Sequence, residues 1–325
     1  MKAFVTGGTG FVGSHLAEEL VRRGYDEVRC LVRSDPKWLD GLPVETVGGD
    51  LFDAEALRRG ARGADIVYHV AGLTRAETQE ALDRANVAGT LNLLAAVRDA
   101  APDVRRVLIT SSLAACGPSG AQPLKEAEPL EPISRYGLSK ARMEEAVQKH
   151  YAGLPVTTVR PPAVYGPREA DIYTIIKAAD KQRVFPVVGK GEQPQLSLVH
   201  VRDLVRGMAD AAEAGKAAGE TYFIGSEAYY AWNEIRDAVL GALGRRALKL
   251  NVPRALVGPV GAAVERVGGL FGQYPPLNRE KAREATASWL CSVAKARRDF
   301  GYRQTVEIED GMAETVRWYR RHGWL

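Results

Sequence analysis

The chain has 325 residues, of which 46% are hydrophobic and 26% are charged, and its formal net charge is +4. This is the composition of a globular protein of one or two domains, which excludes a disordered or fibrous chain. The small net charge argues against nucleic acid as the main partner. Three widely spaced cysteines and five histidines without ligand spacing indicate neither a disulfide framework nor a metal site, and they suit a reducing cytoplasm.

Neither a signal peptide nor a membrane span is expected. Met1 leads directly into a strand pattern, without a basic segment or a long apolar core. The most apolar long stretch, residues 256–271, is interrupted by Pro259, by several glycines and by the charged pair Glu265 and Arg266. We therefore expect a cytoplasmic protein without an integral membrane segment.

The first half of the chain alternates short strand patterns with longer helical patterns. Several strands are continuous apolar runs, which is typical of a sheet with both faces covered. The alternation predicts an α/β fold with a Rossmann-type, doubly wound parallel sheet. The expected strands are residues 2–6, 27–32, 45–50, 65–70, 106–110 and 155–160, and the main expected helices are 14–24, 82–100 and 138–151.

Beyond residue 160 prolines and glycines become frequent and the elements shorten. Residues 196–201 and 221–225 read as further strands with a helix between them, and the rest reads as mostly helical. We expect a dinucleotide-binding domain over residues 1–165, which residues 195–225 rejoin. A smaller, mostly helical C-terminal substrate domain, residues 166–325, is expected to be interleaved with it.

The segment TGGTGFVG, residues 6–13, follows the first strand and opens the first helix. Gly7 would allow a tight turn, Gly10 a close approach to a pyrophosphate, and Gly13 close packing of helix on strand. The helix N-terminus would hold the phosphates. The alternative is a glycine-rich turn without a ligand, but the complete strand–turn–helix setting favours a dinucleotide. The intervening residues expected to contact the cofactor are Thr9, Phe11 and Val12.

The residues after the second strand decide which dinucleotide is expected. An NAD site commonly has an acidic residue there. This chain instead has Arg33, with Ser34 and Lys37 close by. A guanidinium can bind a 2′-phosphate through bidentate hydrogen bonds. The sequence therefore favours NADP, with NAD as the alternative if Arg33 is a solvated loop charge and Asp35 serves the ribose.

Two further strand ends are expected to contact the cofactor. After the third strand, Asp50 is a candidate acceptor for the adenine amino group and Leu51 for contact with the ring, although Asp50 and Asp53 can also cap a helix. Asp53 is the better cap. At the fourth strand end His69 reads as a packed histidine. The small residues that follow suit a backbone passing close to a ribose, namely Val70, Ala71 and Gly72.

The fifth strand is followed by Ser111 and Ser112, and one element later by Tyr136 and Lys140. Residues four apart share a helix face, and a lysine ammonium beside a phenol lowers the phenol pKa and suits it to acid–base work. The alternatives are a turn or cap for the serines and an ordinary surface helix for the tyrosine and lysine. Their place in a chain with a dinucleotide loop favours chemistry.

The chain resembles the extended short-chain dehydrogenases/reductases, the NAD-dependent epimerase/dehydratase family. The resemblance rests on TGGTGFVG, GGDLFD, NVAGTLNLL, TSS, YGLSK, RPPAVYGP and LVHVRDLV, and is nearest to the dihydroflavonol reductase and 3β-hydroxysteroid dehydrogenase-like branch. It implies a catalytic set of Ser112, Tyr136 and Lys140. It implies a structural role near the site for Asn86. The other positions that it assigns are Thr110, Ser111, Pro161, Pro162 and Val164 to the cofactor, and Leu73, Leu113, Ala114 and Arg168 to the substrate.

Departures from the family pattern narrow the function. Cys116 stands where the family often has tyrosine, and Leu113 and Ala114 replace the acidic pair of sugar dehydratases, which disfavours dehydration. The first hypothesis is an NADP-dependent oxidoreductase that interconverts a secondary alcohol and a ketone. The alternatives are a nucleotide-sugar 4-epimerase with tightly bound NAD, and a non-catalytic redox sensor, which would not need the acid–base set.

Two expectations concern surfaces. Residues 252–276 are a candidate lid over an apolar substrate or a membrane-contacting segment, although a helix packed on the domain core is the simpler interpretation. The family resemblance also implies a homodimer through the helices at residues 82–100 and 138–150.

Overall fold

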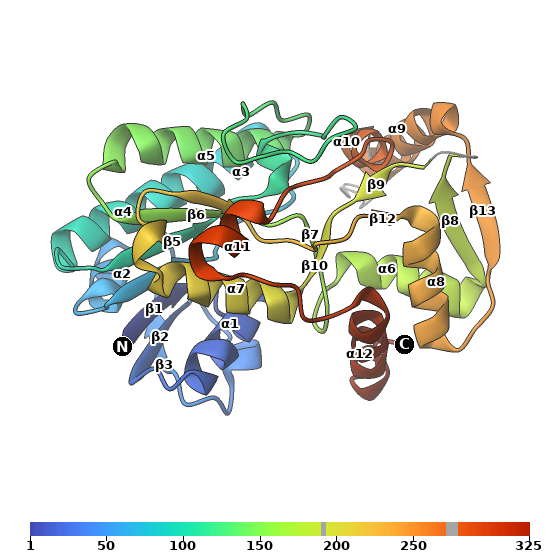
Figure 1. Cartoon of the computed structure of the whole chain (residues 1–325). Coiled ribbons are helices and arrows are strands. Elements are labelled where there is room, and N and C mark those ends of the chain that lie inside the picture. Colours follow the sequence, from blue (N-terminus) through green and yellow to red (C-terminus); the bar gives the residue numbers. More distant parts are fainter. Residues whose placement is uncertain (190–192, 271–278) are drawn as a thin grey trace.

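The structure is a computed structural model that describes residues 1–189, 193–270 and 279–325 (Figure 1). Its centre is a seven-stranded parallel sheet with the strand order β11-β6-β5-β4-β1-β2-β3, which confirms the predicted Rossmann-type fold. The strands are β1 (Lys2–Thr6), β2 (Glu27–Val32), β3 (Glu45–Gly48), β4 (Ile66–His69), β5 (Arg106–Thr110), β6 (Val156–Arg160) and β11 (Thr221–Phe223).

Helices cover both faces of this sheet (Figure 1). On one face α1 (Phe11–Arg22) and α7 (Val201–Glu213) pack through residues such as Leu16 and Met208. On the other face α2 (Ala54–Ala61), α4 (Gly89–Ala100) and α5 (Arg135–Tyr151) pack through residues such as Leu57, Leu93 and Met143.

The apolar strand sequences follow from this double covering. In β1, Ala3, Phe4 and Val5 are all fully buried. Successive side chains of a strand point to opposite faces. Ala3 and Val5 accordingly enter one hydrophobic core, and Phe4 enters the other. A strand with one face in water would have alternated polar and apolar residues instead.

The strand expected at residues 196–201 is divided in the structure. β9 (Gln195–Leu196) pairs antiparallel with β12 (Tyr230–Ala231), and β10 (Leu198–His200) pairs parallel with β7 (Ala163–Tyr165). Neither pair belongs to the central sheet. The break falls at Ser197, whose backbone N–H donates to the carbonyl of Trp289 rather than to a neighbouring strand of the sheet. The chain then enters α7 and returns to the central sheet as its edge strand β11.

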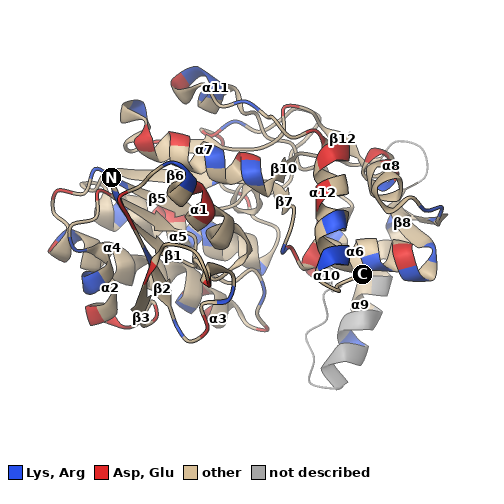
Figure 2. Cartoon of the chain, turned by 90° about the horizontal axis from the view of Figure 1, so that it is seen from below, with Lys and Arg blue, Asp and Glu red and all other residues tan. Residues whose placement is uncertain are grey.

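A second lobe has its own core, which includes Ile176, Phe185, Val239 and Val316 (Figures 1 and 2). Its helices are α6 (Asp171–Lys177), α8 (Trp232–Leu243), α9 (Arg254–Leu270), α10 (Arg279–Ala285) and α12 (Ile308–Arg321), and its small parallel sheet consists of β8 (Val184–Val188) and β13 (Leu248–Val252). Among the described residues, none of the helices combines the length and the apolar character needed to cross a bilayer.

Candidate active site

The glycine loop between β1 and α1 is shaped by close backbone contacts. Gly7 has φ +79°, and a Cβ there would lie 2.5 Å from the amide nitrogen of Ala71. A Cβ on Gly13 would lie 2.1 Å from the carbonyl oxygen of Gly7. Helix α1 begins at Phe11 without a side-chain cap on Gly10. The loop, which also contains Thr9 and Val12, thus offers backbone N–H groups at a helix N-terminus, as a dinucleotide pyrophosphate requires.

The end of β4 lies directly beside this loop, and Asn86 holds it in place. A Cβ on Gly72 would lie 2.8 Å from Oδ1 of Asn86. The same oxygen accepts a hydrogen bond from the Leu73 N–H at 2.8 Å, and Nδ2 donates to the Leu73 carbonyl at 2.9 Å and to Ser139 Oγ at 2.8 Å. Asn86 is fully buried on a single π-helical turn, Arg84–Ala88. It therefore connects the segment Val70–Ala71–Gly72–Leu73 to α5.

His69 is a satisfied core residue, as the sequence indicated. Its Nδ1 lies 2.7 Å from Thr6 Oγ1 and its Nε2 lies 2.8 Å from Thr90 Oγ1. Burial lowers the pKa of His69 to about 3, and the charge of Lys140 acts in the same direction. A histidine with both ring nitrogens occupied and no charge near neutral pH stabilises the joint between β1, β4 and the following helix.

The predicted adenosine side of the cofactor site is open to solvent. Arg33, Ser34 and Lys37 are exposed in the turn after β2, where a carboxylate oxygen of Asp35 accepts a hydrogen bond from the backbone N–H of Lys37 at 2.9 Å. Asp35 is thus engaged locally in the turn.

The two carboxylates after β3, Asp50 and Asp53, accept hydrogen bonds from different backbone N–H groups. Asp53 caps α2 by accepting from the Ala56 N–H, as expected, whereas one oxygen of the exposed Asp50 accepts from the Phe52 N–H at 2.7 Å. Leu51 is half-buried against Gly89, where a Cβ would lie 2.8 Å from its side chain.

The two serines after β5 have different environments. Ser111 is 1% exposed, and its hydroxyl donates to the carboxylate of Glu144. Ser112 is partly exposed, accepts from the Ala114 N–H at 3.1 Å and lies close enough to Tyr136 to lower the pKa of its phenol. The structure thus brings Ser112, and not Ser111, to the tyrosine.

Tyr136 and Lys140 lie in the first turns of α5, which Ser134 caps by accepting from the Gly137 N–H. Burial raises the pKa of Tyr136 to about 12, and the nearby side chain of Ser112 opposes this shift. Burial lowers the pKa of Lys140 to about 8, and the charge of Glu144 opposes this shift. Lys140 Nζ donates to the Thr110 carbonyl at 2.8 Å.

The pKa of the tyrosine differs from the sequence-based expectation. The lysine was expected to lower the tyrosine pKa, but desolvation is the largest influence on both groups. Tyr136 is therefore a neutral phenol near pH 7, as an unshifted tyrosine would be, and in this form it carries a proton that it can donate.

The sequence analysis missed a buried ion pair behind the lysine. Glu144 follows Lys140 by one helical turn, and its carboxylate accepts hydrogen bonds from Nε and Nη2 of Arg160 at 3.0 and 2.6 Å. Both side chains are more than nine-tenths buried. The i+4 spacing from Lys140 was a readable signal for Glu144, but nothing local indicated Arg160 as its partner.

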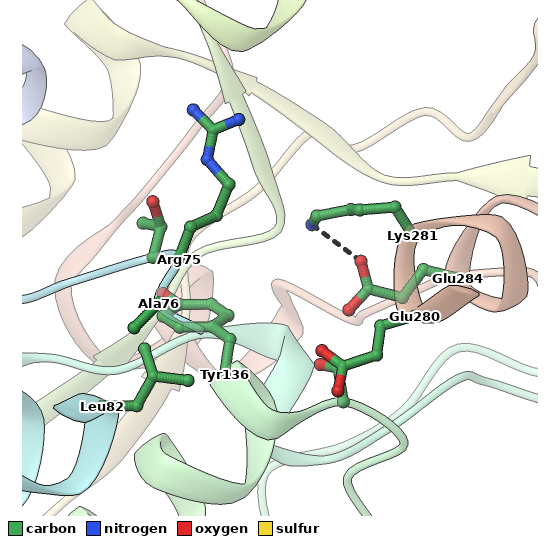
Figure 3. Close-up of a pocket in the computed structure, with 9 residues that line it drawn as sticks. Arg75, Ala76, Leu82, Tyr136, Glu280, Lys281 and Glu284 are labelled. Carbon is green, nitrogen blue, oxygen red and sulfur yellow. Dashed lines mark hydrogen bonds and ion pairs between the residues drawn. The ribbon is translucent and has the colours of Figure 1, made fainter. Parts of the chain in front are cut away.

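Tyr136 lines a pocket of about 290 Å³, which includes space open to solvent (Figure 3). Residues of the loop after β4 and Leu82 form one side, and α10 forms the other with Glu280, Lys281 and Glu284. Lys281 pairs with Glu284 at 2.7 Å, and Arg135 of α5 pairs with Glu280 at 2.7 Å. The sequence analysis did not identify this side of the pocket.

The remaining predicted site residues are distributed differently. Pro161 and Pro162 are buried between β6 and β7, where the Pro161 carbonyl accepts from the Leu113 N–H at 2.9 Å, and Val164 is half-buried in β7. The Leu113 side chain is 2% exposed and packs in a small core cluster rather than facing the pocket. Ala114 is half-buried beside it.

Arg168 does not line the pocket beside Tyr136, and its place near a substrate stays a prediction. Its guanidinium donates to Ser14 Oγ at 2.9 Å and to the carboxylate of Glu18, both on α1, and it lies over the ring of Trp38. The burial of Arg168 beside the opposite charge of Glu18 explains this position, because a guanidinium removed from water needs a partner.

The family model described as "NAD dependent epimerase/dehydratase family" matches residues 3–225. The chain belongs to this family. A ceramide reductase of Caulobacter vibrioides is 32% identical over 99% of this chain and 95% of the relative. A putative dihydroflavonol 4-reductase of Synechocystis is 31% identical over 99% of this chain and 95% of the relative. The predicted resemblance to extended short-chain dehydrogenases/reductases is thus confirmed.

A solved structure of similar fold is that of DesIV, a dTDP-glucose 4,6-dehydratase from Streptomyces venezuelae with NAD and TYD bound. It is 30% identical to this chain with a TM-score of 0.80, and the match covers 100% of this chain and 98% of DesIV. Together with the named reductases among the relatives, the family membership identifies this protein as an NAD(P)-dependent enzyme of the oxidoreductase type.

Proposed function

We propose that the protein is an NADPH-dependent reductase that converts an apolar ketone to a secondary alcohol. The observation that carries the proposal is the phenol of Tyr136 in the wall of the pocket, with Lys140 one helical turn further along α5 and Ser112 close enough to the phenol to lower its pKa. A neutral phenol donates a proton, and ketone reduction requires a proton at the carbonyl oxygen.

The roles follow from the positions of the side chains. The dinucleotide supplies hydride transfer to the carbonyl carbon. Tyr136 delivers the proton to the carbonyl oxygen, and the hydroxyl of Ser112 steadies the same oxygen. Lys140, which is predominantly charged below pH 8, hydrogen-bonds the Thr110 carbonyl, and its Nζ lies close to Gly72. The glycine loop and the segment 70–72 hold the dinucleotide through the backbone.

NADP is the proposed dinucleotide because of the exposed turn after β2. Arg33, Ser34 and Lys37 offer two cations and a hydroxyl to a 2′-phosphate. Arg33→Ala is expected to weaken NADPH binding by about tenfold or more, because a charge-assisted hydrogen bond is lost, and to change NADH binding by less than about twofold. Fluorescence titration with both cofactors measures this, and Arg62→Ala, an exposed loop arginine elsewhere, is the control. Equal losses for both cofactors would favour NAD.

The substrate is proposed to be uncharged at the reacting end. The named activities of some relatives concern lipids or compounds with long apolar chains, for example the ceramide reductase and a ketoreductase of Stigmatella aurantiaca whose named substrate carries a farnesyl chain. The diphosphate of a nucleotide sugar would need basic side chains at the mouth of the pocket, but these side chains already form ion pairs with carboxylates. These pairs are Arg75–Asp171, Arg135–Glu280 and Lys281–Glu284.

A nucleotide-sugar 4-epimerase with retained NAD is the second candidate, because DesIV acts on a nucleotide sugar and shares the fold over its whole length. The two candidates differ in how they hold the cofactor. Denaturing the purified protein and identifying any released nucleotide separates them. An empty site that binds NADPH reversibly supports the reductase, whereas stoichiometric NAD that does not exchange supports the epimerase.

The acid–base role is tested with Tyr136→Phe, which removes only the hydroxyl. Turnover of an apolar ketone is expected to fall by at least about a hundredfold, since general acid catalysis contributes that much, while the NADPH dissociation constant stays within a few-fold. Tyr151→Phe, at the other end of the same helix, is the control. Wild-type turnover in Tyr136→Phe would disprove the proposed mechanism.

We also propose that the protein is a homodimer in which α4 and α5 of one protomer pack on those of the other. The proposal comes from the family resemblance of these helices. Sedimentation equilibrium measures the mass, and a monomer at micromolar concentration would contradict it.

A further inference from the structure

The small sheet of β8 and β13 lies at the edge of the second lobe, farthest from the Rossmann sheet (Figure 1). The parallel register places Leu248 beside Val184 and Leu250 beside Pro186. Because side chains alternate along a strand, these four residues share one face. Leu248 is 70% exposed and Leu250 is 49% exposed. This face is therefore apolar and turned to solvent.

The opposite face of the same sheet is covered. Phe185 and Val187 are fully buried in the core of the second lobe, together with Val239 and Leu243 of α8. The sheet is thus anchored on its inner face. Its outer face has leucines at the positions where a solvated sheet normally has polar residues.

Leu256, in the first turn of α9, extends the apolar surface and is 53% exposed. In the described part of the chain six large hydrophobic side chains are exposed, and Leu248, Leu250 and Leu256 are three of them. Leu248 and Leu250 share one face of β13, and Leu256 follows at the start of α9, so exposed apolar residues are concentrated in this segment rather than scattered singly.

Positive charge is concentrated around the same sheet. The exposed basic residues that directly precede the two strands are Lys181, Arg183, Arg245 and Arg246, and the acidic residue among them is the half-buried Asp180. Lys249 pairs in register with the buried Phe185 and so belongs to the covered face. Asp180 is only 10% exposed and lies 3.3 Å from Lys181 and 3.5 Å from Arg245. The whole chain has a net charge of only +4, so four exposed cations near the start of these two strands make this end of the sheet basic.

We propose that this outer surface, Val184, Pro186, Leu248, Leu250 and Leu256 with the surrounding basic residues, docks on the surface of an anionic lipid bilayer. The leucines would enter the boundary between headgroups and acyl chains, and the arginines and lysines would contact lipid phosphates. The proposal does not depend on the proposed reaction, because it uses no residue of the active site.

Two other occupants fit the surface less well. A second copy of the chain on the same face would set basic residues against basic residues across the two-fold axis. A nucleic acid would use the cations but would leave the exposed leucines without a partner, because its outer surface is charged. An anionic bilayer satisfies both the apolar and the basic groups.

The test is co-sedimentation of the purified full chain with vesicles of phosphatidylcholine alone and of phosphatidylcholine mixed with phosphatidylglycerol. We expect binding to the anionic vesicles that weakens with added salt, and little binding to the neutral ones. No binding of the wild-type chain to anionic vesicles would overturn the proposal.

Two double variants separate the two contributions. Leu248→Ser with Leu250→Ser removes apolar contact, and Arg183→Glu with Arg246→Glu reverses two exposed charges. Each double variant is expected to weaken vesicle binding by at least about tenfold. The reason is that one basic residue near an anionic surface, or one apolar side chain buried in the bilayer, changes the binding constant about severalfold. Arg105→Glu, on an exposed arginine before β5, is the matched control and should bind like the wild type.

The variants change exposed positions, so thermal unfolding and NADPH binding should match the wild type. Wild-type vesicle binding by both double variants would overturn the assignment of this face. If the variants instead dissociate a wild-type dimer in sedimentation equilibrium while vesicles bind none of the proteins, the face is an interface between copies and the proposal is wrong.

Discussion

At the scale of single residues, burial shifts the pKa values of Tyr136 and Lys140, two residues on the same helix, and so decides which of them is charged. Burial raises the pKa of Tyr136 to about 12 and lowers the pKa of Lys140 to about 8. Near pH 7 the tyrosine therefore keeps its proton and the lysine keeps most of its charge. The carboxylate of Glu144 favours the charged lysine, and Arg160 holds that carboxylate in place.

This arrangement predicts the pH dependence of catalysis. If the charged lysine is needed, the reduction rate should decrease as the pH rises through about 8, because Lys140 loses its proton there. Glu144→Gln removes the group that raises the lysine pKa, so the decrease should begin at lower pH. The pH profile of kcat/KM, recorded over the pH range in which the variant stays folded, measures the shift in the pH at which the rate falls.

The control for that experiment is Glu145→Gln, an exposed neighbour on the same helix, which should keep the wild-type profile. A purely structural role for Glu144 predicts a different result, namely a lower rate at every pH with the same midpoint. Such a profile would contradict the link between Glu144 and Lys140.

At the scale of elements, the glycine loop works because strand, turn and helix approach more closely than any side chain permits. A Cβ on Gly13 would lie 2.1 Å from the Gly7 carbonyl oxygen, which is a backbone atom and cannot rotate away. The dinucleotide site and the packing of α1 on the sheet therefore depend on the same contact.

Gly13→Ala is expected to destabilise the fold by about 1–3 kcal/mol, the usual result of overpacking a close contact, and to weaken NADPH binding at least tenfold. Gly241→Ala in α8 is the matched control, because its Cβ would meet no atom within 4 Å, and alanine is the better helix former there. Urea unfolding and cofactor titration measure both effects. Equal stability of the two variants would show that α1 can move to relieve the contact.

At the scale of the whole molecule, the central sheet and the C-terminal segment are held together by buried polar contacts. Asp203 of α7 is 1% exposed and accepts hydrogen bonds from the N–H groups of Thr305 and Val306 and from the Thr305 hydroxyl. It also pairs with Arg206 at 2.8 Å. These contacts position the chain that leads into α12 and the core of the second lobe.

Asp203→Asn is expected to lower the free energy of unfolding by about 2–4 kcal/mol, because the amide leaves buried donors without an acceptor and Arg206 without its counter-charge. Asp237→Asn removes an exposed carboxylate paired with Arg236 and should change stability by less than about 0.5 kcal/mol. Urea unfolding of both variants measures the difference. A loss below 1 kcal/mol for Asp203→Asn would mean that the C-terminal segment is held by its apolar contacts alone.

The central strands and the glycine loop could be read from the sequence because their signals are local. A strand covered on both faces is an apolar run, and a strand–turn–helix with fixed glycine spacing lies within a dozen residues. The spacing of Tyr136 and Lys140 was also local, because one helical turn sets it. The end of the fifth strand located the pair Ser111 and Ser112, and the family resemblance favoured Ser112 between them.

The sequence by itself determined the parallel sheet, the glycine loop and the residue types available for proton transfer, since each depends on neighbouring residues in the chain. Only the tertiary structure decided the partners that are distant in sequence: Arg160 on Glu144, α10 over Tyr136, Arg168 on α1, and β13 beside β8. It also decided the pKa values of Tyr136 and Lys140, because desolvation depends on everything packed around a group. Periodicity records which side of an element is buried, but not what buries it.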